Sequence, residues 1–150
     1  MSYKGQVTAV DLTQYPDLTV VYLGMKVTRL RGIRTVLGLG RPLAALDRDK
    51  LDGLLHQELF LWRLDHVGIR QYWRDFEALE QFTRSAPHNG WWAAFLRDPK
   101  GTGFWHETYR KSGGMEGIYL GLPDTVGFAR FAPNRPREGD YARARQRLAA

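Results

Sequence analysis

Histidines are the side chains of this sequence best suited to chemistry near neutral pH, because imidazole titrates in that range. Of the four, His106 stands out because it lies in the strongly aromatic segment GFWHETYRK at 103–111. An imidazole there can ligate haem iron, act as a general base on an acidic C–H group or a phenol, or hydrogen-bond a bound oxygen. The structural alternative is a core histidine whose ring is satisfied by a backbone carbonyl or a glutamate.

His88 is the second candidate catalytic residue. It follows Pro87 in the first turn of a predicted helix, where the helix dipole disfavours a charged imidazolium. A contact that caps the helix is the structural alternative. His56 and His66 are weaker candidates, and the sequence shows no i,i+4 histidine pair and no cluster of carboxylates. It therefore predicts neither a zinc site nor an iron site with two histidines and one carboxylate.

Aromatic residues make up 13% of the chain and include five tryptophans, more than a domain of this size needs for packing. An aromatic-lined pocket for a planar ligand is the expected use of the surplus. The side chains predicted to line this substrate pocket are Tyr22, Trp73, Trp91, Phe95, Phe104 and Tyr119. Arg110 shares a strand face with His106 and is predicted to bind a cofactor or ligand through an anionic oxygen or a propionate.

Several other chemistries lack support in the sequence. It contains no cysteine, which excludes disulfides, thiolate zinc sites and cysteine nucleophiles. It also lacks a glycine-rich phosphate loop, a Gly-X-Ser-X-Gly elbow and kinase signatures. An oxygenase that works without a cofactor needs none of these, because an electron-rich substrate anion can itself reduce oxygen in a pocket that excludes water.

The elements that must position these residues follow from hydrophobic periodicity. It predicts strands at 18–27, 54–62, 67–73, 103–111 and 117–122, and helices at 29–49, from Asp75 and from Pro87. Gly38, Gly40 and Pro42 interrupt the first helix, so we expect it to kink or split.

This order of elements is close to the split βαβ order of a ferredoxin-like sheet. The predicted fold class is α+β, with a ferredoxin-like antiparallel sheet and helices on one of its faces. The other face needs cover, and a second copy of the same sheet would provide it as a dimeric α+β barrel. Within 103–111, alternation places Phe104, His106 and Arg110 on one face and Trp105 and Tyr109 on the other.

Charge and composition suggest how the 150 residues are organised. We expect an N-terminal arm at 1–17, the barrel domain at 18–132 and a basic C-terminal tail at 133–150. The net charge of +6 is concentrated in residues 26–50, with seven basic and two acidic side chains, and in residues 130–150, with six and two. No nucleic-acid-binding module accompanies these stretches, so we interpret them as solvated faces.

The remaining expectations concern location and partners. The apolar run at 18–25 is too short to cross a bilayer, and the chain shows no signal peptide. We expect a cytoplasmic homodimer that binds a small-molecule substrate, with neither a nucleic acid nor a membrane as partner.

Four segments carry a family resemblance. They are VVYLGMKVTRLRGIR at 20–34, QYWRDFEALEQFTRSAPHNGWWAAF at 71–95, GFWHETYR at 103–110 and MEGIYLGLP at 115–123. Together they resemble a bacterial and fungal monooxygenase-like family that includes a fumagillin-pathway monooxygenase relative. The resemblance implies the dimeric α+β barrel superfamily, which contains the antibiotic-biosynthesis-type monooxygenases.

A more distant resemblance is to the haem-containing aldoxime dehydratases, which share this barrel. Their proximal iron ligand is the histidine of a His-Glu pair that follows an aromatic residue, and the segment WHE at 105–107 is similar to that pattern. The segment APH at 86–88 is only loosely similar to their helix-opening Pro-X-His, and 119–123 has no counterpart of their distal histidine. The resemblance implies a haem b with His106 as its metal ligand.

Three functions therefore stay open. The leading hypothesis is a monooxygenase-like oxidoreductase that acts on a small hydrophobic or aromatic substrate with no cofactor. The first alternative is a haem-dependent lyase with His106 as proximal ligand, and the second is a ligand-binding module without catalysis, a use that this fold also serves.

Overall fold

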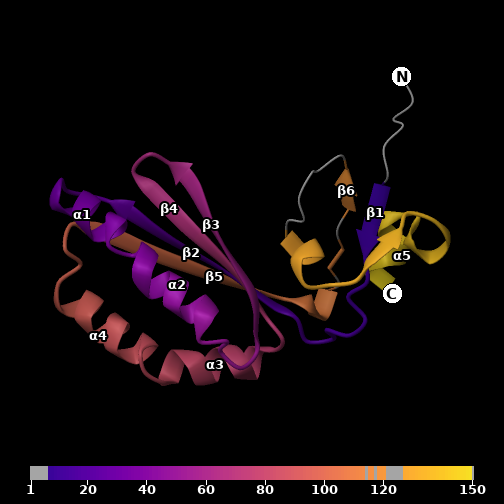
Figure 1. Cartoon of the computed structure of the whole chain (residues 1–150), viewed down its shortest axis with the longest axis horizontal. Coiled ribbons are helices and arrows are strands. Elements are labelled where there is room, and N and C mark those ends of the chain that lie inside the picture. Colours follow the sequence, from indigo (N-terminus) through magenta and orange to yellow (C-terminus); the bar gives the residue numbers. More distant parts are fainter. Residues whose placement is uncertain (1–6, 114, 117, 121–126, 150) are drawn as a thin grey trace. The chain divides into compact units, whose positions relative to one another are not determined.

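The computed structural model describes residues 7–113, 115–116, 118–120 and 127–149 (Figure 1). The chain divides into two compact units, and each is considered by itself. One unit is Leu18–Arg110, and the other combines the segments 1–17 and 111–150.

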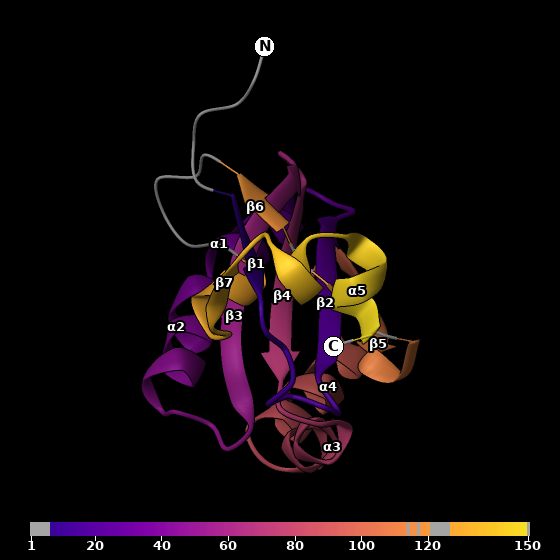
Figure 2. The ribbon, with the colours of Figure 1, turned by 90° about the vertical axis from the view of Figure 1, so that its right-hand side faces the viewer.

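The unit Leu18–Arg110 is a four-stranded antiparallel sheet with helices on one side. Its strands are β2 (Thr19–Val27), β3 (Leu54–Arg63), β4 (His66–Trp73) and β5 (Thr102–Arg110), and its helices are α1 (Arg31–Leu37), α2 (Gly40–Arg48), α3 (Phe76–Arg84) and α4 (His88–Arg97). The strands lie in the order β3-β4-β2-β5, which Figure 2 shows side by side. This order confirms the predicted α+β ferredoxin-like class.

Local sequence explains where these helices begin and end. The predicted helix at 29–49 splits into α1 and α2, and Gly38 closes the first of them. Asp75 caps α3, because its carboxylate accepts a hydrogen bond of 2.7 Å from the backbone N–H of Ala78. Ahead of β5 the chain turns through Lys100 and Gly101, which both have positive φ.

The strand register assigns every side chain of the sheet to one of two faces. Val21 pairs with Gln71 and with Thr108, and these alternate positions form the helix-facing side. Tyr22 pairs with Arg70 and with Glu107, and these positions form the open side. The core lies on the helix-facing side. Its buried members are Val21, Leu46, Trp73, Ala78, Leu79 and Phe82.

The second unit contains a three-stranded sheet in the order β6-β1-β7. Its elements are β1 (Val7–Val10), β6 (Ile118–Leu120), β7 (Asn134–Pro136), α5 (Ala144–Ala149) and the single-turn helices η1 (Lys111–Gly113), η2 (Gly127–Arg130) and η3 (Gly139–Tyr141). This division differs from the predicted barrel domain at 18–132. The segment 111–132 groups with the arm and the tail because β6 pairs with β1, within the arm, and not with the four-stranded sheet.

The arm and the basic tail therefore form regular structure together. Asp11 follows β1 and is buried, and its carboxylate accepts hydrogen bonds from Thr13 at 2.6 Å and from Arg135 at 2.9 Å. Arg147 of α5 is also buried and donates to Glu116 at 2.7 Å. Of the helices in the described residues, none is long and apolar enough to cross a membrane.

Candidate functional site

His106 lies in the middle of β5 on the helix-facing side, where it pairs in register with Leu23. The side chain is exposed, and its ring lies 5.9 Å from the ring of Phe104, centroid to centroid. Within the described part of the chain, the imidazole makes no hydrogen bond. Both ring nitrogens are therefore available to a ligand.

Aromatic side chains of α4 extend the surface beside His106. Phe104 lies 5.9 Å from Phe95 and 5.9 Å from Trp92, and the rings of Trp92 and Phe95 stack at 6.1 Å. Helix α4 has the apolar sequence HNGWWAAFLR, yet none of its side chains is buried. Aromatic surface therefore stays accessible next to the imidazole, as a binding site for a planar ligand requires.

Arg110 lies at the end of β5, on the same face as His106. Its guanidinium stacks over the ring of Phe76, 5.2 Å from the centroid. Four positions of extended strand separate the two residues, or about 13 Å. A ligand that contacts both side chains must span roughly that length.

The structure gives His88 a partner of its own. The residue is half-buried, its Nδ1 lies 3.2 Å from the carbonyl oxygen of Thr83, and its ring lies 5.2 Å from that of Phe82. Because a carbonyl oxygen only accepts, the hydrogen bond requires a proton on Nδ1. His88 thus links the start of α4 to the end of α3, and its catalytic role stays a prediction.

The six predicted pocket residues do not form one group. Phe95 and Phe104 meet beside His106, and Trp91 is exposed on α4. Trp73 is fully buried in the core, whereas Tyr22 lies on the open side of the sheet. Tyr22 cannot line one pocket with Phe104, because the sheet separates it from the helices. Trp73 lies on the same side as Phe104, but its complete burial leaves no surface for a ligand.

Tyr119 and Trp92 are the other two aromatic residues relevant to the predicted pocket. Tyr119 belongs to β6 of the other unit, and its side chain lies outside the part that the structure describes. Trp92 was missed by the sequence analysis, although its helical i,i+3 spacing to Phe95 could have identified it.

The open side carries a polar cluster that sequence reasoning also missed. Arg70 hydrogen-bonds Glu58 through two nitrogens, with Nε 3.0 Å from the carboxylate, and donates to the hydroxyl of Tyr22 at 3.2 Å. Burial disfavours the charged guanidinium, but the hydrogen bonds with Tyr22 and Glu58 outweigh it and raise the pKa of Arg70. The sequence signal for this cluster is the alternation of side chains along the strand, which places Arg70 and Ile69 on opposite faces.

Tyr109 and Glu107 form a second polar contact on the open side. The tyrosine hydroxyl donates to the carboxylate, and this hydrogen bond raises the pKa of Tyr109. Both side chains are exposed. The phenol is therefore held in its protonated form and points away from the helices.

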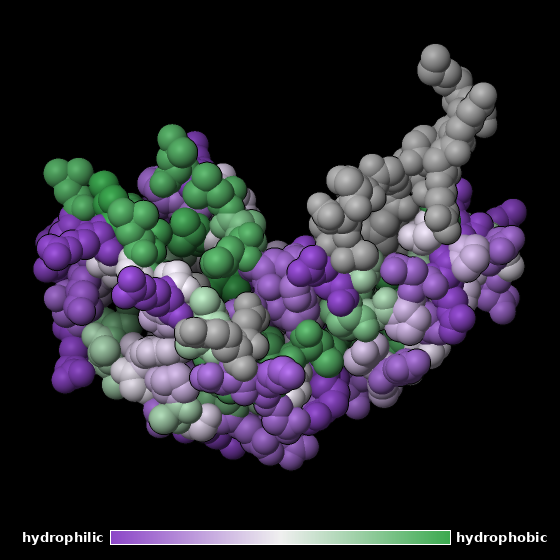
Figure 3. Space-filling view, in the orientation of Figure 1, coloured by the Kyte–Doolittle hydropathy of each residue, from purple (hydrophilic) through white to green (hydrophobic). Residues whose placement is uncertain are grey.

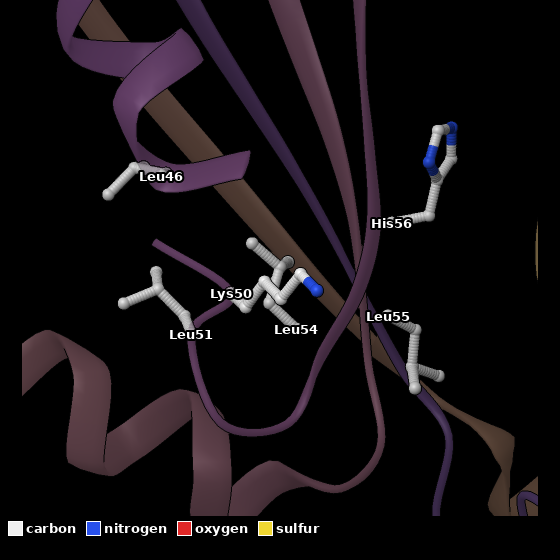
Figure 4. A pocket seen from close by; sticks show the side chains of 6 residues that line it. All are labelled: Leu46, Lys50, Leu51, Leu54, Leu55 and His56. Carbon is white, nitrogen blue, oxygen red and sulfur yellow. The ribbon is translucent and has the colours of Figure 1, made fainter. Parts of the chain in front are cut away.

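A cavity of about 320 Å³ lies at the other edge of the sheet (Figure 4). Its lining residues are Leu46, Lys50, Leu51, Leu54, Leu55 and His56. It sits where the pairing of β3 with β4 shifts by one residue, between Leu54 and His56. Most of its lining is leucine, so we place no chemistry there. Within the described residues, no group of three or more histidine, aspartate or glutamate side chains is placed to hold a metal ion.

Comparison with known proteins identifies related sequences and folds. The model of a family described as monooxygenase af470-like matches residues 18–128. No curated protein sequence matches the chain.

Two solved aldoxime dehydratases share the fold. One, in complex with butyraldoxime, has a TM-score of 0.67 and 20% identity, covering 98% of this chain and 44% of its own. The other has a TM-score of 0.65 and 18% identity, and the match covers 99% of this chain and 47% of that dehydratase. A conserved Bacteroides thetaiotaomicron protein, described as a possible oxidoreductase, has a TM-score of 0.52 and 14% identity, covering 63% and 98%. The chain thus spans less than half the length of either dehydratase, and at these identities the likeness concerns the fold.

Proposed function

The chain belongs to the monooxygenase af470-like family, and we propose on that premise that it oxidises a small hydrophobic or aromatic substrate bound between β5 and α4. The observation that carries this proposal is the accessible imidazole of His106 beside the rings of Phe104, Phe95 and Trp92. These rings would hold a planar substrate, and the imidazole would contact its acidic group.

Oxidation of a phenol by O₂ is one reaction that fits this proposal. His106 takes the phenolic proton, and the electron-rich anion then transfers electrons to O₂. Conversion of the phenol to a quinone inserts one oxygen atom and releases the other as water, so the substrate supplies all four electrons. The aromatic surface favours this step by displacing water from around the anion.

Oxygen uptake by the purified protein tests this proposal. With a panel of phenolic substrates, His106→Ala should lower kcat by roughly 100-fold or more if the imidazole is the general base. His56→Gln is a matched control, because His56 lies on the open side and pairs with Glu58 at 3.4 Å. Equal uptake by the wild type and the His106 variant would contradict the proposal.

Haem binding is the second candidate function, and the surroundings of His106 fit it. An accessible imidazole without a hydrogen bond in the described residues would hold the iron, and the flat rings next to it would contact the macrocycle. Arg110 on the same face would pair with a propionate. Haem, when bound, supplies the redox or Lewis-acid chemistry of its iron.

An absorption spectrum decides between these functions. A Soret band that is lost in His106→Ala supports haem. A colourless protein that consumes oxygen with a phenol supports the first proposal. A colourless protein that shifts its tryptophan fluorescence on adding aromatic ligands, with no oxygen uptake, supports a binding module.

We also propose that two copies pair through the open side. Within the unit Leu18–Arg110, as far as the structure describes it, this side exposes Trp62 and Tyr109 and carries no helix, so a second sheet would cover exposed aromatic surface. Sedimentation at micromolar concentration should show a dimer. Tyr109→Glu should convert it to a monomer, and a monomeric wild type would contradict the proposal.

A further inference from the structure

Helix α1 turns its apolar stripe away from the sheet. Leu30, Ile33 and Leu37 recur at helical spacing, and the side chains of Leu30 and Leu37 are 86% and 79% exposed. In an ordinary surface helix such a stripe faces the core. The orientation of α1 therefore requires a physical cause.

The cause is the close approach of Gly32 to the turn before β5. A Cβ atom at this position would lie 2.1 Å from the carbonyl oxygen of Gly101, so only glycine fits there. The same oxygen accepts hydrogen bonds from the backbone N–H groups of Thr28, at 2.8 Å, and Arg29, at 3.1 Å. Backbone contacts thus fix which side of α1 is buried, and the apolar stripe is left on the outside.

The β3–β4 hairpin exposes further leucines near the same end of the sheet. Leu59 and Leu61 are exposed on edge strand β3, and Leu64 in the turn is 96% exposed. The turn is tied to the end of β2, just before α1, because the N–H of Val27 donates to the carbonyl of Asp65 at 2.8 Å. Figure 3 shows apolar atoms gathered over α1 and over the outer part of the hairpin. We call Leu30, Ile33, Leu37, Leu59, Leu61 and Leu64 the α1–hairpin patch.

Basic side chains predominate near this patch, where Asp65 in the hairpin turn is an exposed acidic residue. Lys26, Arg29, Arg34 and Arg63 are all exposed, and none of them pairs with a carboxylate among the residues that the structure describes. Arg31, on α1, is the exception and pairs with Asp98 at 2.9 Å. The patch thus combines protruding aliphatic side chains with a rim of cations.

We propose that the α1–hairpin patch docks on a bilayer surface that carries anionic headgroups. Aliphatic side chains would enter the interfacial region while the arginines contact lipid phosphates, the pattern of peripheral membrane binding. The sequence-based expectation of no membrane partner rested on the absence of a spanning segment, which surface docking does not need.

Charge argues against a second copy as the occupant. A two-fold contact would bring this basic rim against itself, and like charges at an interface oppose association. Shape argues against a groove on another protein, because the leucines protrude from two separate elements. A lipid surface accepts such protrusions without a complementary shape.

Vesicle cosedimentation of the full chain tests the proposal. The protein should bind phosphatidylcholine vesicles that contain phosphatidylglycerol and should release them at high salt. Leu30→Ser/Leu64→Ser and Arg29→Gln/Arg34→Gln should each weaken partitioning roughly tenfold or more. Leu96→Ser is the matched control, because Leu96 is 65% exposed on α4 and lies outside the patch.

Three results would overturn the proposal. The first is no binding to the anionic vesicles at low salt, and the second is binding that the patch variants leave unchanged. The third is a change of oligomeric state in Leu30→Ser/Leu64→Ser, by sedimentation without lipid, which would assign the patch to another copy of the chain.

Discussion

The indole nitrogen of Trp105 donates a hydrogen bond of 2.8 Å to Nε2 of His66. The two residues belong to β5 and β4, which lie on opposite sides of β2. The contact is possible because Gly24 lies between them in β2. A Cβ atom there would lie 2.1 Å from the indole nitrogen, so the ring lies directly over the glycine.

Gly24→Ala should therefore destabilise the protein by about 1–3 kcal/mol, because the indole must move off the strand and lose its acceptor. Urea unfolding followed by tryptophan fluorescence would measure the loss. Gly40→Ala is the control, since nothing lies within 4 Å of an added Cβ at that position in α2. It should be neutral or stabilise by up to about 1 kcal/mol. Equal effects of the two substitutions would refute the role of the indole.

Substitutions of the two candidate histidines should affect activity and stability differently. His106 is exposed and makes no hydrogen bond in the described residues, so His106→Ala should change the unfolding free energy by less than about 0.5 kcal/mol. His88 bonds the carbonyl of Thr83 at 3.2 Å, so His88→Ala should cost about 1 kcal/mol. Thermal unfolding and oxygen uptake on the same preparations check both. Unfolding caused by His106→Ala would make that residue structural.

Asp11 should make the stability of its unit depend on pH. Hydrogen bonds from the Thr13 side chain and backbone, together with Arg135, lower the pKa of Asp11 from 3.8 to about 2 in the folded state. The resulting stabilisation, about 2 kcal/mol, is complete above the unfolded pKa of 3.8 and is lost as the pH falls toward 2. Unfolding of the wild type and Asp11→Asn from pH 6 to pH 3 measures it, because the two curves should converge toward low pH.

A matched control for Asp11 is the exposed pair of Arg31 and Asp98, whose side chains are both at least half exposed. Asp98→Asn should change the unfolding free energy by less than about 1 kcal/mol. A difference between wild type and Asp11→Asn that stays constant over the same pH range would show that Asp11 acts through packing alone.

Arg70 and Glu58 should be strongly coupled. Removing Arg70 takes the guanidinium away from the half-buried carboxylate of Glu58, so Arg70→Met should cost about 1–3 kcal/mol. In Glu58→Gln/Arg70→Met the buried negative charge is also gone, and part of the loss should be recovered. A double-mutant cycle from urea unfolding gives the coupling. The exposed pair of Arg84 and Glu80 should give at most about 0.5 kcal/mol in the same cycle.

Strand β5 is the element whose side-chain arrangement could best be predicted from the sequence. Alternation alone placed His106 with Phe104 and Arg110 on one face, and the register confirms that grouping. Grouping residues from different strands failed for Tyr22 and Trp73. Their relation depends on how β2 pairs with β4, and this register is fixed by contacts between distant segments that no local pattern contains.

The direction in which helix α1 turns its apolar residues could not be predicted from the sequence. Periodicity identified the stripe of Leu30, Ile33 and Leu37 but contained no information on the direction it faces. That direction depends on Gly32 meeting the carbonyl of Gly101, about seventy residues later in the chain. The cluster of Arg70 with Glu58 escaped notice for the same reason, because its partners come from different strands.

The glycines of the open side have a consequence for how the sheet comes apart. Gly24 and Gly68 face each other across the two central strands, and each is covered by a ring from an edge strand, Trp105 from β5 and Phe60 from β3. Each edge strand is thus held to its neighbour by a ring that packs over a glycine, as well as by backbone hydrogen bonds. The resistance of an edge strand to fraying therefore depends on a glycine in the neighbouring strand.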